Sequence, residues 1–128
     1  MADARLVKQL VPPGIVEQAE GLLIWHGGLV VTPGMTFVNV VVEHPAGHPW
    51  FDRDWMRNNR FGDLISASIV DQESAREIVD LRRGQTSGAS PIMGSRYAER
   101  TLDPGEYVLK IQVALPGDTF SRDYRFVS

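Results

Sequence analysis

Two histidines and two aspartates lie close together in the sequence and have the chemistry to bind a metal ion. His44, His48, Asp52 and Asp54 fall within eleven residues, beside proline and glycine. Imidazole nitrogen and carboxylate oxygen are ligands of Zn²⁺ and similar divalent ions. Their spacing matches no strong metal motif, and exposed loop residues give the same pattern. We therefore predict no bound metal and no cofactor, and keep a small metal-dependent hydrolase using His44, His48 and Asp52 as an alternative.

Other catalytic patterns are missing from the sequence. The string from Gly88 to Gly94 contains Ser90, but it lacks the spacing of a nucleophile elbow. There is no phosphate-binding loop and no dinucleotide-type glycine fingerprint. His26 is followed by two glycines, which is typical of a turn or a bulge. We therefore predict that the protein is not an enzyme.

The most unusual segment combines aromatic residues with arginines. Tryptophan, phenylalanine, methionine and arginine are enriched at protein interfaces and at their energetic centres. The candidate binding residues are Trp50, Phe51, Arg53, Trp55, Arg57 and Arg60. One alternative is that Trp50 or Trp55 is the core tryptophan of a strand and the arginines are solvated. Another is that Trp50, Phe51 and Trp55 stack on a carbohydrate or another small ligand.

Composition limits the classes of partner. The 128 residues carry a formal net charge of −3, so attraction to nucleic acid or to anionic membranes is not expected. The sequence contains no cysteine. Eleven of the 13 basic residues are arginine, which favours protein contacts. The longest apolar runs, Gly21 to Trp25 and Phe37 to Val42, are far shorter than the roughly 20 residues of a membrane helix. No signal peptide is recognisable, and localisation to a virion or to the cytoplasm stays open.

The first residues are predicted to form an arm. Pro12, Pro13 and Gly14 interrupt helix and sheet alike, so residues 1–14 are taken as an N-terminal arm and residues 15–128 as one domain. Apolar residues of the arm have helical spacing, but one short helix is marginal unless it docks on something.

The segment from residue 21 to residue 44 predicts three short strands. They are separated by the string His-Gly-Gly and by the turn Thr-Pro-Gly. Phe37 to Val42 is apolar on both faces except at Asn39, which favours a central strand covered on both sides. Residues 45–62 are predicted to be a long connection that includes at most one short strand.

The middle of the chain is harder to assign. Residues 64–70 alternate like a strand with one apolar face. Residues 71–84 predict a short crossing helix, because Asp71 suits an N-cap and Gly84 a terminator. The alternative is a strand over Glu77 to Leu81, since Ile78 and Val79 are β-branched. The glycine- and serine-rich residues 84–95 predict a mobile loop.

The C-terminal segment predicts a hairpin from Glu106 to Phe126. In its first strand, apolar residues alternate with Lys110 and Gln112. The side chains expected to be largely buried are Tyr107, Leu109, Ile111, Tyr124 and Phe126.

Two strings resemble immunoglobulin-like domains. LDPGEYVLKIQV resembles the late strands of immunoglobulin-like and fibronectin type III-like modules. In these modules a turn precedes a tyrosine whose hydroxyl ties the corner to nearby backbone. Gly105 would lie in that turn and Tyr107 would be that tyrosine. LVVTPGMTFVNVVVEHPAG is similar to the early strands of bacterial and viral members. The resemblance implies an all-β, immunoglobulin-like antiparallel β-sandwich, with the short crossing helix and the N-terminal arm added. Without a cysteine pair it is not of the antibody type.

Such a family implies adhesion, spacing, ligand-binding or virion-decoration roles. We therefore expect a non-catalytic structural or interaction module, an accessory component of a larger assembly such as a phage or viral particle. Its partner would be another protein or a second copy, contacted through the arm and the aromatic-arginine segment. A carbohydrate- or small-ligand-binding sandwich is the main alternative.

Overall fold

Antiparallel β-strands make up the regular structure of the chain. The computed structural model describes residues 7–19, 21–44, 64–87, 92–115 and 117–128, with backbone alone for residues 82–87. The strands are β1 (Lys8–Val11), β2 (Gly14–Ala19), β3 (Leu22–Thr32), β4 (Met35–Glu43), β5 (Ile65–Asp71), β6 (Glu77–Ser87), β7 (Ile92–Ala98), β8 (Glu106–Ala114) and β9 (Thr119–Val127). None of the described residues forms an apolar helix of membrane-spanning length. The predicted all-β class is confirmed.

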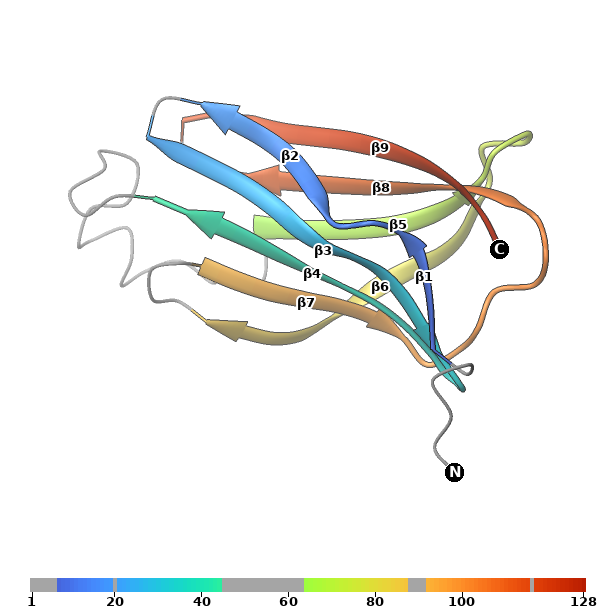
Figure 1. Ribbon diagram of the computed structural model, residues 1–128. Helices are drawn as coiled ribbons and strands as arrows, with labels where there is room; N and C mark the ends of the chain where they lie inside the picture. The colour runs from blue at the N-terminus through green and yellow to red at the C-terminus, as the bar shows by residue number, and fades with distance from the viewer. Residues whose placement is uncertain (1–6, 20, 45–63, 88–91, 116) are drawn as a thin grey trace.

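The strands form two facing sheets (Figure 1). Sheet A has the order β3-β4-β7-β6, with β1 and β2 paired to successive parts of β3 at its edge. Sheet B has the order β6-β5-β8-β9. β6 belongs to both sheets, because Leu81 pairs with Ala67 of β5 whereas Arg82 pairs with Tyr97 of β7. As predicted, β4 is a central strand, between β3 and β7.

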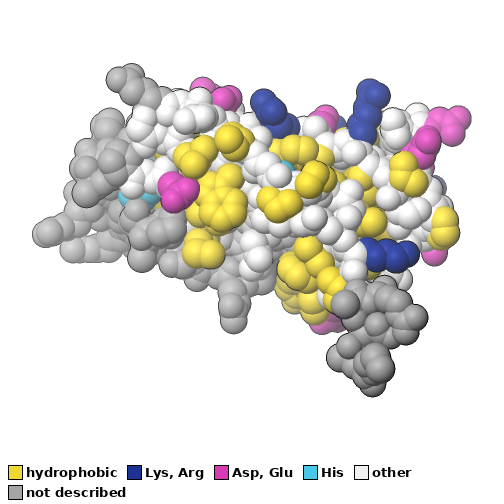
Figure 2. Space-filling view, in the orientation of Figure 1, with side chains coloured by type: hydrophobic (Ala, Val, Ile, Leu, Met, Phe, Trp, Pro, Cys, Tyr) yellow, Lys and Arg dark blue, Asp and Glu magenta, His cyan; other side chains and the backbone are white. Residues whose placement is uncertain are grey.

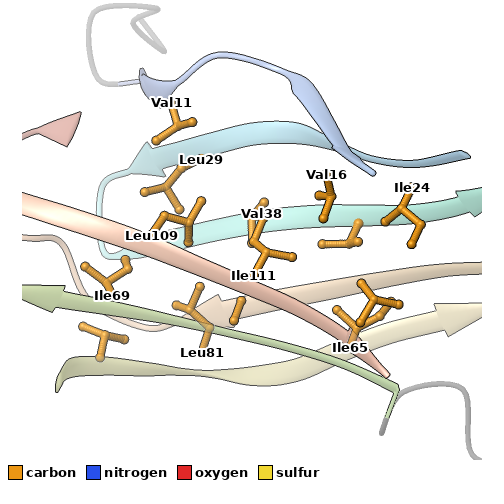
Figure 3. Packing of buried hydrophobic residues seen from close by; sticks show 14 of the residues in the cluster. Val11, Val16, Ile24, Leu29, Val38, Ile65, Ile69, Leu81, Leu109 and Ile111 are labelled. Carbon is orange, nitrogen blue, oxygen red and sulfur yellow. The ribbon is translucent and has the colours of Figure 1, made fainter. Parts of the chain in front are cut away.

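The core fills the space between the sheets (Figure 3). Ile24 and Val38 from sheet A and Leu109 and Ile111 from sheet B are almost completely buried. Burying one such side chain contributes about 1.5–3 kcal/mol relative to leaving it exposed. With no cysteine in the sequence, this packing takes the place that a disulfide holds in many small domains.

The predicted C-terminal hairpin is confirmed. β8 and β9 pair along their whole length, from Glu106 opposite Val127 to Ala114 opposite Thr119. Of the five residues expected to be buried, four are buried and Tyr124 is partly buried. These side chains lie on the face of the hairpin that points toward sheet A.

The predicted crossing helix over residues 71–84 is wrong. Asp71 does cap the following turn, because its carboxylate accepts hydrogen bonds from the backbone N–H and the hydroxyl of Ser74 at 2.8 and 2.9 Å. The turn ends at Ala75, whose φ of 58° cannot continue a right-handed helix. The chain then returns as β6, so the alternative of a strand over Glu77 to Leu81 is the observed structure.

The three strands predicted between residues 21 and 44 are two. Thr-Pro-Gly is a turn, but His-Gly-Gly is a β-bulge inside the single strand β3, where the pairing with β4 shifts between His26 and Leu29. Gly28 has a φ of +95°, and a Cβ there would lie 2.6 Å from the Val11 carbonyl oxygen. The glycine therefore bends the strand without ending it.

The predicted mobile loop over residues 84–95 is largely strand. Residues 84–87 belong to β6 and residues 92–95 to β7, whereas residues 88–91 lie outside the described residues. Gly94 serves packing here, since a Cβ would lie 2.8 Å from Ile65 Cδ1 of the other sheet. At the N-terminus, residues 8–11 of the predicted arm form β1 on β3, and residues 1–6 are not described.

Candidate interaction surface

The six residues predicted to bind a partner lie outside the described residues. Trp50, Phe51, Arg53, Trp55, Arg57 and Arg60 all belong to residues 45–63. The same holds for His48, Asp52 and Asp54 of the alternative metal site, while His44 directly follows β4 and is partly buried. Within the described ranges, no group of three or more histidines or carboxylates is placed to hold a metal ion. The hypotheses for this segment remain predictions.

The structure draws attention instead to the outer face of sheet A, which points away from the core. In the first row of residues across the strands, Ile15 lies opposite Trp25, Trp25 opposite Val41 and Val41 opposite Met93. In a second row, which on β4 lies four residues from the first, Val30 lies opposite Phe37 and Phe37 opposite Tyr97. We call these seven side chains the apolar face: Ile15, Trp25, Val30, Phe37, Val41, Met93 and Tyr97.

The apolar face is partly open to solvent. Ile15 and Met93, at the two ends of the first row, are 49% and 45% exposed. Val41, between larger neighbours, is buried. Figure 2 shows hydrophobic side chains gathered over β2, β3 and β4 on this side of the molecule. Isolated exposed apolar residues are normal, but a contiguous group on a sheet face is typical of a contact surface.

Hydrogen bonds hold parts of the apolar face in place. Trp25 Nε1 donates to the Glu43 carboxylate at 2.7 Å, which fixes the indole ring within the first row. Between the two rows, Ser95 Oγ donates to Asn39 Oδ1 at 2.6 Å. A surface whose side chains are fixed before contact loses less entropy on binding.

The outer face of sheet B has the opposite character. One of its rows places Ser68 beside Lys110 and Lys110 beside Asp123. The Lys110 ammonium pairs with the Asp123 carboxylate at 3.1 Å, an exposed contact that contributes little stability. The next row places Ser66 opposite Gln112. Ser66, Ser68, Lys110 and Gln112 line an open hollow of about 320 Å³ on this face.

His26 is a completely buried histidine at the bulge of β3. Its Nδ1 accepts a hydrogen bond from the Gly28 backbone N–H at 3.0 Å, so the proton of the neutral ring is on Nε2. Nε2 has no hydrogen-bond partner among the described residues. The Tyr124 ring of sheet B packs edgewise against the imidazole, with the two ring centroids 4.6 Å apart. Burial lowers the pKa of His26, which favours the neutral form. The expectation of a bulge residue is confirmed.

Arg96 is a buried cation of the core. Its Nε and Nη2 both donate to the Ile65 carbonyl oxygen, at 2.9 and 2.6 Å, and its Nη1 donates to the Ser95 carbonyl oxygen at 2.7 Å. The two bonds to Ile65 connect β7 of sheet A to the first residue of β5 in sheet B. The guanidinium therefore joins the sheets at the end of sheet B where β5 begins, at Ile65.

Sequence reasoning missed the apolar face for a physical reason. Whether two residues on different strands share a face depends on register, which no local pattern gives. One signal was present, because Phe37 to Val42 is apolar on both faces and β4 was expected to be covered on both sides. Trp25 and Met93 join that face only through their pairing with Val41.

No protein-family model matches the chain, and no curated protein sequence matches it.

Proposed function

We propose that the chain is an immunoglobulin-like sandwich that acts as a non-catalytic interaction module through the apolar face. The fold part is supported by strand order. In constant-type immunoglobulin domains, strands A, B, E and D form one sheet and strands C, F and G the other. If β3 to β9 are taken as A to G, the observed orders β3-β4-β7-β6 and β5-β8-β9 have the same arrangement.

The corner before β8 supports the same proposal. The Tyr107 hydroxyl donates to the Asp103 carbonyl oxygen at 2.7 Å, as a tyrosine at the start of strand F does in a tyrosine corner. Gly105 lies under the ring, where a Cβ would be 3.3 Å from the hydroxyl. In antibody domains the second cysteine follows this tyrosine by two residues. Leu109 holds that position here and is completely buried.

The functional part rests on one observation, the difference between the two outer faces. An antiparallel sheet that packs on one side only is expected to be polar on its other side. Sheet B is polar there along the Ser66 and Ser68 rows, and its apolar part is the pair of Val70 and Val108. The outer face of sheet A is apolar over four strands, so covering it with a partner releases free energy. Fold-level analogy alone does not choose a function, and the setting in a phage or viral particle rests on the resemblance alone.

A hydrophobic dye tests whether this face is an accessible contact surface. At low protein concentration, 8-anilinonaphthalene-1-sulfonate should bind the folded chain and accept excitation energy from its tryptophans, of which Trp25 lies in the apolar face. Met93→Asp should reduce this signal several-fold, because it places a charge in the first row. Gln112→Asp, a charge of the same kind on the exposed face of sheet B, should leave it unchanged. Equal dye binding by both variants, at equal melting temperature, would refute the proposal.

A further inference from the structure

A pocket opens between the two sheets at the end of the sandwich where β1 begins and β9 ends (Figure 1). We call it the end pocket. Its lining comes from β1, from the end of β3 and the turn that follows, from the connection between β7 and β8, and from the residue after β9. Its volume of about 310 Å³ equals that of roughly ten water molecules. The end pocket is separate from the apolar face, because Val31 lines it while the neighbouring Val30 points to the other side of the sheet.

The floor of the end pocket is apolar and continues the core. Leu102 belongs to the core cluster, and Leu10 packs against that cluster. Val31 and Pro33 complete the apolar part of the lining. Such a surface favours the hydrocarbon part of a ligand, because moving apolar groups out of water releases free energy.

Hydrogen bonds hold one wall of the end pocket in place. This wall is the connection between β7 and β8. The completely buried Thr36 donates its hydroxyl to the Arg100 carbonyl oxygen at 2.7 Å. Gly105 and Ser128 exchange two backbone hydrogen bonds at 3.3 and 2.9 Å. Residues 101 and 102, which line the pocket, lie between these two attachments, so the wall is formed before a ligand binds and less entropy is lost on binding.

A cation and two hydroxyl groups accompany this apolar floor. Lys8 lines the end pocket, is exposed, and has no carboxylate partner within the ranges that the structure describes. Thr32 and Thr101 also line it, and neither hydroxyl makes a hydrogen bond to another described residue. No aspartate or glutamate is among the described residues of the lining. An ammonium group and hydroxyl donors suit a carboxylate, and an apolar pocket with a few polar groups is the usual form of a small-molecule site.

We propose that the end pocket binds a small amphipathic carboxylate, with the hydrocarbon chain against Leu10 and Leu102 and the carboxylate at Lys8. The inference goes beyond the proposed function, because it concerns a different part of the molecule and a different class of partner. A pocket with the volume of roughly ten waters admits a ligand of about ten non-hydrogen atoms, the size of octanoate. A ligand this small, held in an open pocket, should have a dissociation constant on the order of 1 mM.

An NMR titration of the full chain with octanoate tests the proposal. Saturable shifts should appear at the amides of Val31, Thr101 and Leu102. Lys8→Gln should raise the dissociation constant of octanoate about threefold, as expected for the loss of an exposed ion pair, and should leave that of octanol unchanged, since octanol has the same hydrocarbon chain without the charge. Lys110→Gln alters the only other lysine of the sequence and should change neither affinity. Thr101→Trp, which fills the pocket from an exposed position, should remove the shifts caused by both ligands.

Each other outcome overturns the inference. The end pocket does not bind such a ligand if octanoate gives no saturable shifts up to about 20 mM, roughly twentyfold above the expected dissociation constant. Shifts confined to Trp25 and Met93 would place the ligand on the apolar face and leave the proposed function intact. If Lys8→Gln weakens octanol as much as octanoate, or has no more effect than Lys110→Gln, the lysine does not receive the carboxylate. Nuclear Overhauser contacts from the Leu102 methyl groups to the first six residues of the chain, in place of octanoate, would assign the pocket to that segment.

Discussion

Replacing Tyr107 by phenylalanine isolates the hydroxyl that ties the corner before β8. The ring should stay in place, because it is buried and stacks on Phe126 with a centroid distance of 5.6 Å. Only the 2.7 Å hydrogen bond to the Asp103 carbonyl oxygen is lost. A hydrogen bond of this kind contributes about 0.5–1.5 kcal/mol net. Asp103 is exposed, so water can solvate the freed carbonyl and the cost should be about 1 kcal/mol.

Urea unfolding followed by tryptophan fluorescence measures this cost. A loss of about 1 kcal/mol should lower the midpoint without changing the slope, and should lower the melting temperature by roughly 4 °C in a chain of this length. Tyr124→Phe is the matched control, because its hydroxyl donates to the Ile15 carbonyl oxygen at 3.2 Å from a more exposed position and should matter less. If Tyr107→Phe unfolds like the wild type, the hydroxyl does not hold the corner. A loss of 3–5 kcal/mol, as expected for removing the whole ring, would mean that the ring itself had moved.

Four further predictions concern the core, the bulge, the buried histidine and the aromatic-arginine segment. Ile111→Ala should cost about 2–5 kcal/mol in urea unfolding, and a melting temperature that hardly changes would contradict its core position. Gly28→Ala should cost about 1–3 kcal/mol, because of its positive φ and its contact with the backbone of β1, whereas Gly27→Ala should be tolerated. Burial lowers the pKa of His26 in the folded chain, so the unfolded chain binds the proton first as pH falls below about 6.5. Over this range the free energy of unfolding should decrease by at most about 1.4 kcal/mol per pH unit. The decrease should end when pH reaches the pKa of the folded state. NMR titration of the His26 ring measures that pKa, and a value at or above 6.5 would contradict the reasoning. Arg57→Ala should raise the dissociation constant for a captured partner about thirtyfold and change the free energy of unfolding by less than about 0.5 kcal/mol. If the variant unfolds, the arginine has a structural role instead.

The sequence predicted best where local pattern and tertiary structure agree. The strict alternation from Tyr107 to Val113 identified a strand, its buried face and its hairpin partner. The helix over residues 71–84 failed because Asp71 and Ser74 give the same capping pattern to a tight turn as to a helix N-terminus. What separates the two is the left-handed backbone of Ala75, which the identity of that residue does not reveal.

The candidate site was predictable only in part. Apolar residues on both faces of β4 indicated a covered strand, and one of those faces lies in the core. Assembling the other face required the register of β2, β3 and β7, which follows from the bulge at Gly28 and from packing between the sheets. The aromatic-arginine segment stands apart from this result, because its residues lie outside the described ranges.

The strand β6 has a mechanical consequence for the whole domain. Because its first half is hydrogen-bonded to β5 and its second half to β7, a continuous backbone ladder joins the two sheets along one side. On the other side, Tyr124 of β9 contacts sheet A across the gap: its hydroxyl donates to the Ile15 carbonyl of β2, and its ring packs on His26 of β3. The two sheets are thus held together by backbone hydrogen bonds on the β6 side and by side-chain contacts on the Tyr124 side. Fluctuations that admit water to the core should begin on the Tyr124 side and leave the pairing of β6 intact. Amide hydrogens of β2 should therefore exchange before those of β5.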